Sequence, residues 1–286
     1  MSDKNAIVAV IGAGGKMGTR ITNNLVKCNE YELKLCETSP RKIEEIEAKG
    51  LQISEMNETV KSSDVVILAV PDTAIGNVSK QIVPNMKPGA VLLTLDPAAA
   101  YAGLLHTRED ITSIVAHPCH PSVFGKYLTE EEHADFFGGI AAEQDVVIAK
   151  YSGDEDKFNV GQEVVRNMYA PVGEIHRITV KDMAILEPTL AEVITCMIGT
   201  VFKESLEETV KKGVPEKAAK AMLYGHIQIA LSVALKGTNP FSDAAMIAID
   251  YGKEAIIKSD WKRVFNDEEL DKVVGKMLKL EQPVNR

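Results

Sequence analysis

The sequence predicts an α/β fold in which a doubly wound parallel sheet is followed by an all-helical second domain. Three observations lead to this prediction. An apolar run at residues 7–11 enters a glycine cluster that opens a helical pattern. Strand and helix patterns then alternate to about residue 150, and beyond about residue 180 only helical patterns remain. We therefore expect a first domain at residues 1–177 and a second domain at residues 178–286.

The glycine cluster has the spacing of a phosphate-binding turn. Glycines stand at positions 12, 15 and 18, whereas the third glycine of the commonest spacing would fall at Met17. A strand, a tight turn and a helix N-terminus in this order bring backbone N–H groups and the helix dipole to a pyrophosphate, as in Rossmann-type domains. The turn predicts a dinucleotide cofactor bound through Gly12, Gly14, Gly15, Lys16, Met17 and Gly18.

A second strand, at residues 31–36, ends in an acidic residue, Glu37. A dinucleotide-binding fold places an acid about 20 residues past the glycines, where it accepts hydrogen bonds from the ribose hydroxyls. A carboxylate there repels a 2′-phosphate, so the sequence favours NAD over NADP. Arg41 keeps NADP open, since a guanidinium in the same loop can accommodate that phosphate.

The remaining elements of the first domain follow in order. Pro40 follows a capping serine and opens a helix that stops at Gly50. The apolar run at residues 64–70 is typical of a strand buried on both faces. We predict further strands at 51–54, 90–95, 113–116, 145–150 and 171–176, with helices at 98–105 and 154–168.

The second domain shows four helical patterns. They run from about residue 180 to 212, from Pro215 to Gly237, onward from Ser242, and onward from Asn266. The last pattern begins with a capping box that pairs Asn266 with Glu269.

Composition and charge narrow the class of protein. A chain of 286 residues favours two domains, and its 45% hydrophobic and 26% charged residues are ordinary for a soluble protein. The net charge of −9 argues against nucleic acid or an anionic membrane as a partner. No apolar run approaches the roughly 20 residues of a membrane span, and no signal-peptide layout is present. The four scattered cysteines favour reduced thiols in the cytoplasm.

Two histidines are the first candidates for chemistry. His117 and His120, bracketed by prolines, lie directly beyond the strand at 113–116, where ligands bind in open α/β sheets. Histidine suits proton transfer near neutral pH and also ligates metals. Both histidines can instead pack a proline-rich turn. Cys119 between them suggests a thiol nucleophile, but no neighbouring cation is evident to lower its pKa.

Further candidates lie in the helical domain. Glu187 precedes Pro188, and Glu192 lies inside an apolar stretch, where a carboxylate needs a partner, a metal or a cleft. If Pro188 begins a helix, Glu187 becomes a cap, and an ion pair between helices is an alternative role for Glu192. His226 lies in another mostly apolar helix, where histidine is more often a hydrogen-bonded core residue than a functional one.

The order of the two domains resembles the 6-phosphogluconate dehydrogenase and hydroxyacid dehydrogenase superfamily. The stretch Val65–Asp72 (VVILAVPD) resembles the end of the fourth strand of that superfamily, so the resemblance implies that Val70 and Pro71 contact the cofactor. The catalytic lysine and asparagine of its G-x-x-x-K-x-x-x-N helix have no counterpart at residues 185–192, which read ILEPTLAE. This departure puts the ordinary β-hydroxyacid mechanism in doubt. Helical second domains of the superfamily often build dimers, so the resemblance implies a homodimer.

Over nearly its whole length the chain resembles the D-apionate oxidoisomerases. The segments that carry the resemblance are GAGGKMG (12–18), AHPCHPSVF (116–124), LEP (186–188), GHIQI (225–229) and FSDA (241–244). The resemblance implies NAD-dependent oxidation of a branched sugar acid, D-apionate, coupled to a carbon shift that gives 3-oxo-isoapionate.

That chemistry assigns roles to the candidate residues. Oxidation of a secondary alcohol requires a base, for which His120 or His117 is suited. The carbon shift requires a polarised carbonyl, which suits a divalent cation held by His120 and Glu192, together with Glu187 and His117. Three alternatives stay open: a plain hydroxyacid dehydrogenase, a non-catalytic NAD-binding sensor or assembly protein, and a semialdehyde dehydrogenase that uses Cys119.

Overall fold

The computed structural model describes residues 6–284, which divide into two compact units. The first unit extends to Leu186 and also includes the segment that begins at Asp271, and the second comprises Glu187–Leu270. The sequence places the boundary at 177/178 and assigns the whole C-terminus to the helical domain. The two divisions therefore differ in where they put the last helix.

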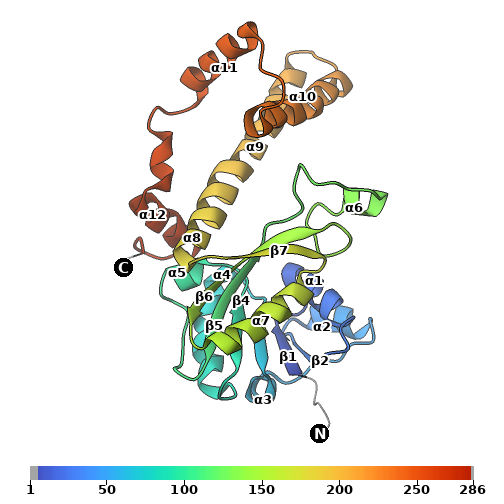
Figure 1. Ribbon diagram of the computed structural model, residues 1–286, viewed down its shortest axis with the longest axis vertical. Helices are drawn as coiled ribbons and strands as arrows, with labels where there is room; N and C mark the ends of the chain where they lie inside the picture. The colour runs from blue at the N-terminus through green and yellow to red at the C-terminus, as the bar shows by residue number, and fades with distance from the viewer. Residues whose placement is uncertain (1–5, 285–286) are drawn as a thin grey trace. The chain divides into compact units, whose positions relative to one another are not determined.

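The first unit is built on a seven-stranded sheet with strand order β2-β1-β3-β4-β5-β6-β7 (Figure 1). Its strands are β1 (Ala6–Ile11), β2 (Tyr31–Cys36), β3 (Val65–Leu68), β4 (Val91–Thr94), β5 (Thr112–Pro118), β6 (Gln144–Ser152) and β7 (Val172–Arg177). Strands β1 to β5 are mutually parallel, so their carboxyl ends lie along one edge. The chain order reverses at β1, which has β2 on one side and β3 on the other.

Helices connect the strands on both faces of this sheet. They are α1 (Lys16–Leu25), α2 (Pro40–Glu47), α3 (Met56–Ser62), α4 (Asp72–Ile82), η1 (Val83–Asn85), α5 (Ala98–Tyr101), α6 (Glu130–Ala134), α7 (Glu155–Met168) and α8 (Val180–Ala184). Crossover connections between parallel strands are right-handed. Helix α1 connects β1 to β2 in one direction along the sheet and α4 connects β3 to β4 in the other, so the two helices lie on opposite faces. Helix α7 packs against α1, β4 and β5, whereas α4 packs against α5.

Strand β6 departs from the all-parallel prediction. It pairs antiparallel to β5, with Val115 opposite Ala149, and parallel to β7. The residues between β5 and β6 form a long loop that contains only α6, so the chain returns along β5 without a crossover helix. Two smaller expectations also change: the strand at 51–54 is a single bridge between Leu35 and Ile53, and the helix at 98–105 ends at Tyr101.

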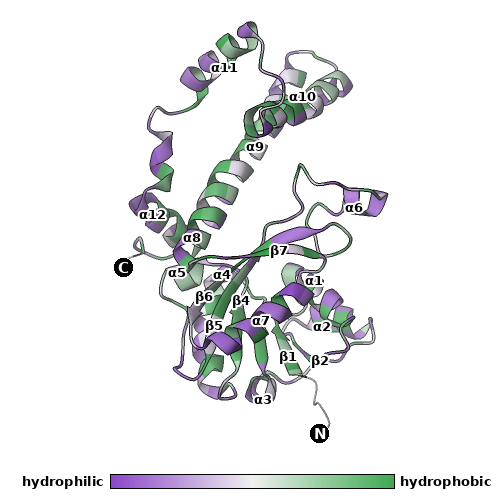
Figure 2. Ribbon diagram, in the orientation of Figure 1, coloured by the Kyte–Doolittle hydropathy of each residue, from purple (hydrophilic) through white to green (hydrophobic). Residues whose placement is uncertain are grey.

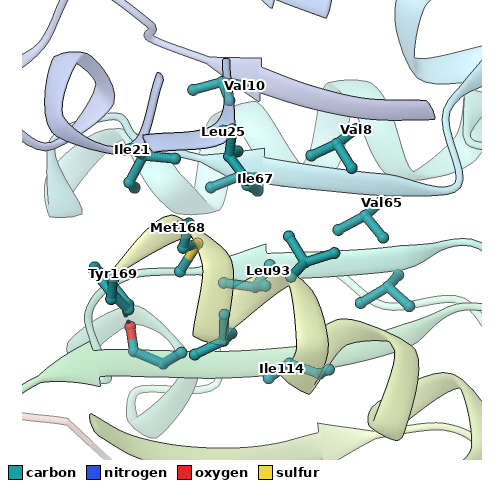
Figure 3. Packing of buried hydrophobic residues seen from close by; sticks show 14 of the residues in the cluster. Val8, Val10, Ile21, Leu25, Val65, Ile67, Leu93, Ile114, Met168 and Tyr169 are labelled. Carbon is teal, nitrogen blue, oxygen red and sulfur yellow. Dashed lines mark hydrogen bonds between the residues drawn. The ribbon is translucent and has the colours of Figure 1, made fainter. Parts of the chain in front are cut away.

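The core of the first unit lies between the sheet and its helices. Val8, Val65 and Ile67 from neighbouring strands are fully buried, as is Ile21 of α1 (Figure 3). Strands β1, β4 and β5 are mostly hydrophobic, whereas β7 is largely hydrophilic, and α2 and α7 contain both hydrophobic and hydrophilic residues (Figure 2). Burying one such aliphatic side chain stabilises the fold by about 1.5–3 kcal/mol, so this layer fixes the sheet whose edge carries the candidate site.

The second unit is helical, as predicted. Its elements are the π-helix η2 (Ile185–Cys196), α9 (Met197–Lys211), α10 (Glu216–Lys236), α11 (Asp243–Ile256) and η3 (Trp261–Phe265), and α12 (Asp267–Met277) follows across the boundary. Residues 180–211 are helical throughout, so Pro188 does not begin a helix but lies inside the π-helix. A proline removes an N–H donor and crowds the preceding turn, and the wider π turn accommodates it.

Helix α10 exposes most of its apolar residues, and the apolar residues of α9 are exposed or half-buried. Neither α9 nor α11 has a buried residue in the part of the chain that the structure describes, and α10 buries only Ala219. By length and composition, the helices Val180–Lys211 and Glu216–Lys236 are long and apolar enough to cross a membrane. The sequence contains no uninterrupted apolar run of this length, yet both helices meet the criterion. The criterion averages hydropathy over 18 residues and so tolerates the charged residues that interrupt each apolar run. Core helices of soluble proteins meet the same criterion.

Candidate active site

The glycine turn connects β1 to α1 at the carboxyl edge of the sheet. Gly12 has φ +83°, and a Cβ there would lie 2.5 Å from the carbonyl oxygen of Ala69. A Cβ on Gly18 would collide with the carbonyl oxygen of Gly12, so only glycine lets α1 pack this closely on the turn. Gly18 therefore meets the packing requirement of the third glycine, one position later than usual. Gly15 is the N-cap of α1, and no described side chain caps this N-terminus.

The end of β3 lies next to this turn. Ala69 continues the ladder by donating its N–H to the carbonyl oxygen of Ile11 at 2.8 Å. Val70 is half-buried and Pro71 is exposed directly before α4. Since the strand order reverses at β1, the space outside β1 and β3 is the switch point at which ligands bind in open α/β sheets. The structure thus brings the predicted cofactor contacts of both strands to one place.

Glu37 lies at the end of β2 and reaches back to the glycine turn. Its Oε2 accepts a hydrogen bond from the Gly14 N–H at 3.0 Å, and its Oε1 accepts from Ser39 and Thr38. Partial burial opposes ionisation, but these main-chain donors outweigh it and lower the pKa of Glu37. Arg41 instead pairs with Glu45 one helical turn away, at 2.9 Å.

His117 is a neutral imidazole at the carboxyl end of β5. Burial lowers its pKa to about 4, despite a hydrogen bond between its Nδ1 and the carbonyl oxygen of Leu95, 2.9 Å away. Because a carbonyl only accepts, Nδ1 carries the proton and Nε2 keeps a lone pair. Leu95 directly follows β4, so His117 lies at the same edge as the glycine turn.

His120 follows His117 by three residues and has an unusual backbone conformation. Its φ is +61°, in the left-handed region that few residues other than glycine adopt. Its Nδ1 lies 2.8 Å from the carbonyl oxygen of Phe137, and its ring stands edge-on to that of His117, with centroids 6.3 Å apart. Among the residues that the structure describes, neither histidine has a hydrogen-bond partner at Nε2. The structure therefore brings His117 and His120 together, each with one nitrogen held and the other available.

Cys119 lies between the histidines but lacks the features of a nucleophilic thiol. Desolvation raises its pKa, and the nearby carboxylate of Asp145 raises it further. A raised pKa suppresses the reactive thiolate. The local environment therefore argues against the semialdehyde dehydrogenase alternative.

The candidate glutamates both belong to the π-helix of the second unit. Glu187 is 8% exposed, whereas Glu192 is exposed. Residues five apart are about 1.4 turns apart in an α-helix, but in a π-helix they are joined by a hydrogen bond. The π geometry therefore places Glu187 and Glu192 on successive turns of one face, which the sequence alone does not reveal.

His226 is exposed on α10, contrary to the expectation of a core histidine. Its Nδ1 contacts the carbonyl oxygen of Met222 at 2.9 Å. No group of three or more His, Cys, Asp or Glu side chains arranged to hold a metal occurs within residues 6–284. The predicted metal pair divides between the units, with His120 in the first and Glu192 in the second.

Sequence reasoning missed the groups that orient the two histidines. The Leu95 and Phe137 contacts use main-chain carbonyls, which no side-chain pattern signals. Asp135 was also missed, although its carboxylate is buried and accepts three backbone N–H groups. An Asp followed closely by the glycine pair at 138–139 is a turn signal that points to this segment.

Fold and site together define the class: a dehydrogenase-type dinucleotide-binding sheet joined to a helical domain. Two family models agree. The model for the phosphogluconate dehydrogenase (decarboxylating) C-terminal domain matches residues 126–278, and the model for the coenzyme F420-dependent NADP oxidoreductases matches residues 7–96.

Individual relatives narrow the class. The chain is 57% identical to a D-apionate oxidoisomerase of Pectobacterium atrosepticum over 96% of both chains, and 43% identical to one of Blautia hydrogenotrophica over 97% of this chain and 98% of that one. It belongs to the D-apionate oxidoisomerase family. A crystal structure of a semialdehyde dehydrogenase NAD-binding protein from Cupriavidus necator, in complex with calcium and NAD, is 40% identical with a TM-score of 0.92, covering 96% of this chain and 100% of that one.

Proposed function

We propose that this chain oxidises D-apionate with NAD and rearranges it to 3-oxo-isoapionate. The observation that carries the proposal is local: one sheet edge holds both the glycine turn and two imidazoles whose Nε2 atoms have no hydrogen-bond partner among residues 6–284. The choice of substrate is supported by the relatives named D-apionate oxidoisomerase. A plain hydroxyacid dehydrogenase would use the same edge without the carbon shift.

The cofactor we propose is NAD. Gly12, Gly14 and Gly15, with Lys16, Met17 and Gly18 at the start of α1, would bind the pyrophosphate through main-chain N–H groups and the helix dipole. The ionised Glu37 at the end of β2 favours ribose hydroxyls and repels a 2′-phosphate. The exposed pair of Arg41 with Glu45 supports the same choice. Val70 and Pro71 would line the opposite side of the turn. When bound, NAD accepts the hydride from the substrate carbon.

We assign the general base to His120. A base works best when its pKa lies near the working pH, and a pKa of about 4 makes His117 a weak proton acceptor. The Nε2 of His120 would take the hydroxyl proton while its Nδ1–H stays on the Phe137 carbonyl. His117 would then orient the substrate through its Nε2 lone pair. Glu187 and His226 remain candidate catalytic residues of the helical unit.

A divalent cation is the second cofactor that we propose. The donors suit one, since an exposed carboxylate on Glu192 and the oxygens of a polyhydroxylated acid are the ligands that hard divalent cations prefer. The sequence pairs His120 with Glu192 as ligands, but an Nε2 atom bound to a cation cannot also accept the substrate proton. With His120 assigned as the base, Glu192 would hold the cation, and substrate oxygens would complete its coordination. The cation would polarise the carbonyl across which the carbon substituent moves.

We also propose that the protein is a homodimer. Met222 and Ile229 on α10 are 63% and 54% exposed, and they lie seven residues apart on one helical face, with His226 between them. Exposed apolar surface of this kind marks an interface, and the occupant that we propose is the helical unit of a second copy. We further propose that the protein is cytoplasmic, which its scattered cysteines support. The net charge of −9 argues against nucleic acid or an anionic membrane as a partner.

The test combines turnover with product analysis. Purified protein is mixed with NAD and a panel of aldonic acids that includes D-apionate, with and without EDTA. NADH formation from D-apionate and a rearranged carbon skeleton in the NMR spectrum of the product are the expected results. If the reaction requires the proposed divalent cation, EDTA should abolish turnover and added cation should restore it.

Each alternative has its own outcome in the same assay. An oxidised product with the original skeleton would establish a plain dehydrogenase. Tight NAD binding without turnover of any acid would establish a sensor. Loss of activity in Cys119→Ser would support the semialdehyde dehydrogenase mechanism instead, although the raised pKa of that thiol argues against it.

A further inference from the structure

The segment that follows α6 is folded around one carboxylate. Asp135 is 6% exposed, and its Oδ2 accepts hydrogen bonds from the N–H groups of Ile140, Ala141 and Ala142 at 3.0, 2.9 and 3.1 Å. Three charge-assisted bonds to one oxygen close residues 135–142 into a fixed turn. We call these residues the Asp135 turn.

The Asp135 turn presents one main-chain carbonyl to the candidate base. The oxygen of Phe137 lies 2.8 Å from Nδ1 of His120, and the ring of Phe137 stands edge-on to the imidazole, with centroids 5.9 Å apart. On its other side, the guanidinium of Arg20, on α1, lies 4.4 Å from the centroid of the same ring. Phe137 therefore contacts His120 and Arg20 of α1, although its side chain remains 60% exposed.

The contact determines which nitrogen of His120 is basic. A carbonyl oxygen accepts and never donates, so Nδ1 must carry a proton while this contact exists. The lone pair then lies on Nε2, the nitrogen without a described partner. Without the contact, the proton is able to move to Nε2 and leave that nitrogen unable to accept one.

We propose that Asp135 is a positioning residue that fixes the tautomer of His120 through the Phe137 carbonyl. The inference rests on the proposed role of His120 as the base. In the reaction, the substrate O–H bond breaks and its proton forms a new bond to Nε2. The resulting imidazolium keeps its Nδ1–H on Phe137, which stabilises the added charge. Asp135 itself touches neither substrate nor cofactor.

The direct test reads the tautomer without turnover. Protein labelled with ¹⁵N-histidine is examined by long-range ¹H–¹⁵N NMR near neutral pH, with the His120 signal assigned from His120→Gln. The wild type should hold His120 with the proton on Nδ1. Asp135→Ala should shift the population toward Nε2–H, and Asp135→Asn, which keeps one acceptor oxygen, should lie between the two. The matched control is Glu55→Ala, which removes a carboxylate bound to two backbone N–H groups at the start of α3.

Kinetics supply the second readout. We expect Asp135→Ala to lower kcat on D-apionate about tenfold and to shift the acidic limb of its pH profile, with the NAD affinity within about twofold of wild type. Asp135→Asn keeps the test valid if the alanine variant fails to fold. An unchanged His120 tautomer in a folded Asp135 variant, or an equal shift in Glu55→Ala, would overturn the proposal. Inactivity of the wild type on D-apionate beside the expected tautomer shift would instead contradict the proposed function.

Discussion

The two compact units bury their apolar residues in opposite ways. In the first unit, α1 and α7 each bury five residues against the rest of the unit, and strands β3 and β4 are fully buried. In the second unit, the described parts of α9 and α11 bury none. Both units nevertheless have ordinary amphipathic or apolar helical sequences (Figure 2). The first unit covers its apolar surface with its own chain, whereas α9 and α11 in the second unit have no buried residue among those described, a surface that the proposed dimer would cover.

This contrast separates what each unit contributes to function. A unit with its own core can hold the geometry of a cofactor turn and two oriented histidines without help. A unit with exposed apolar helices acquires its final surroundings only when something covers them. The groups in the first unit can therefore be interpreted from one chain, whereas the proposed roles of Glu192 and His226 would depend on the proposed dimer.

The largest expected effect comes from charging the exposed face of α10. The double variant Met222→Glu and Ile229→Glu puts two carboxylates on this face, and burying them unpaired is costly. We expect the dimer to weaken at least about 1000-fold, or about 4 kcal/mol, measured by analytical ultracentrifugation. The control is Val160→Glu on α7, an exposed apolar residue of the first unit, which should leave the assembly unchanged. A monomeric wild type that binds lipid vesicles would contradict this account of the second unit.

The next effect concerns the stability of the first unit as the pH falls. His117 has a pKa of about 4 when folded and 6.5 as its reference value, so the unfolded chain takes up its proton first. This stabilisation is complete above about pH 6.5 and is lost as the pH falls toward 4, by up to about 3 kcal/mol. Urea unfolding at several pH values should show a shallower decline for His117→Gln than for wild type. An equal reduction in slope for the exposed His133→Gln would refute the assignment.

The smallest effect compares two glycines with similar backbone angles. Gly12 and Gly50 have φ +83° and +77°, so alanine at either costs about 1–2 kcal/mol of backbone strain. Only at Gly12 does the added Cβ also collide, with the carbonyl oxygen of Ala69. We expect Gly12→Ala to weaken NAD binding about 30-fold and Gly50→Ala to leave it within about twofold, by calorimetry. Equal losses would mean that the turn is not the cofactor site.

Much of the first unit could be predicted because its signals are local. The glycine spacing, the apolar strands and the acid at the end of β2 each depend on neighbouring residues. The antiparallel direction of β6 could not be predicted, because an apolar strand has the same sequence pattern in a parallel and in an antiparallel pair. The fixed turn that holds the Phe137 carbonyl was missed because it depends on main-chain contacts.

The helical unit was predictable in its elements but not in its environment. The helix ends near Gly213 and Gly237 follow from glycine and basic residues, and Ser242 caps α11 as its sequence suggests. The apolar surroundings of Glu192 and His226 suggested burial, yet both are exposed in the single chain. The π turn across Pro188 also has no simple sequence signature, although it determines how Glu187 and Glu192 face each other.

The central claim is that the sheet edge binds NAD through the glycine turn and takes the substrate proton on His120. The most direct test measures two quantities in His120→Gln and in wild type: kcat on D-apionate and the Kd for NAD. Loss of the base should lower kcat about 100- to 10,000-fold while the NAD affinity stays within about twofold of wild type. A kcat within about threefold of wild type, in a variant that still binds NAD, would contradict the claim.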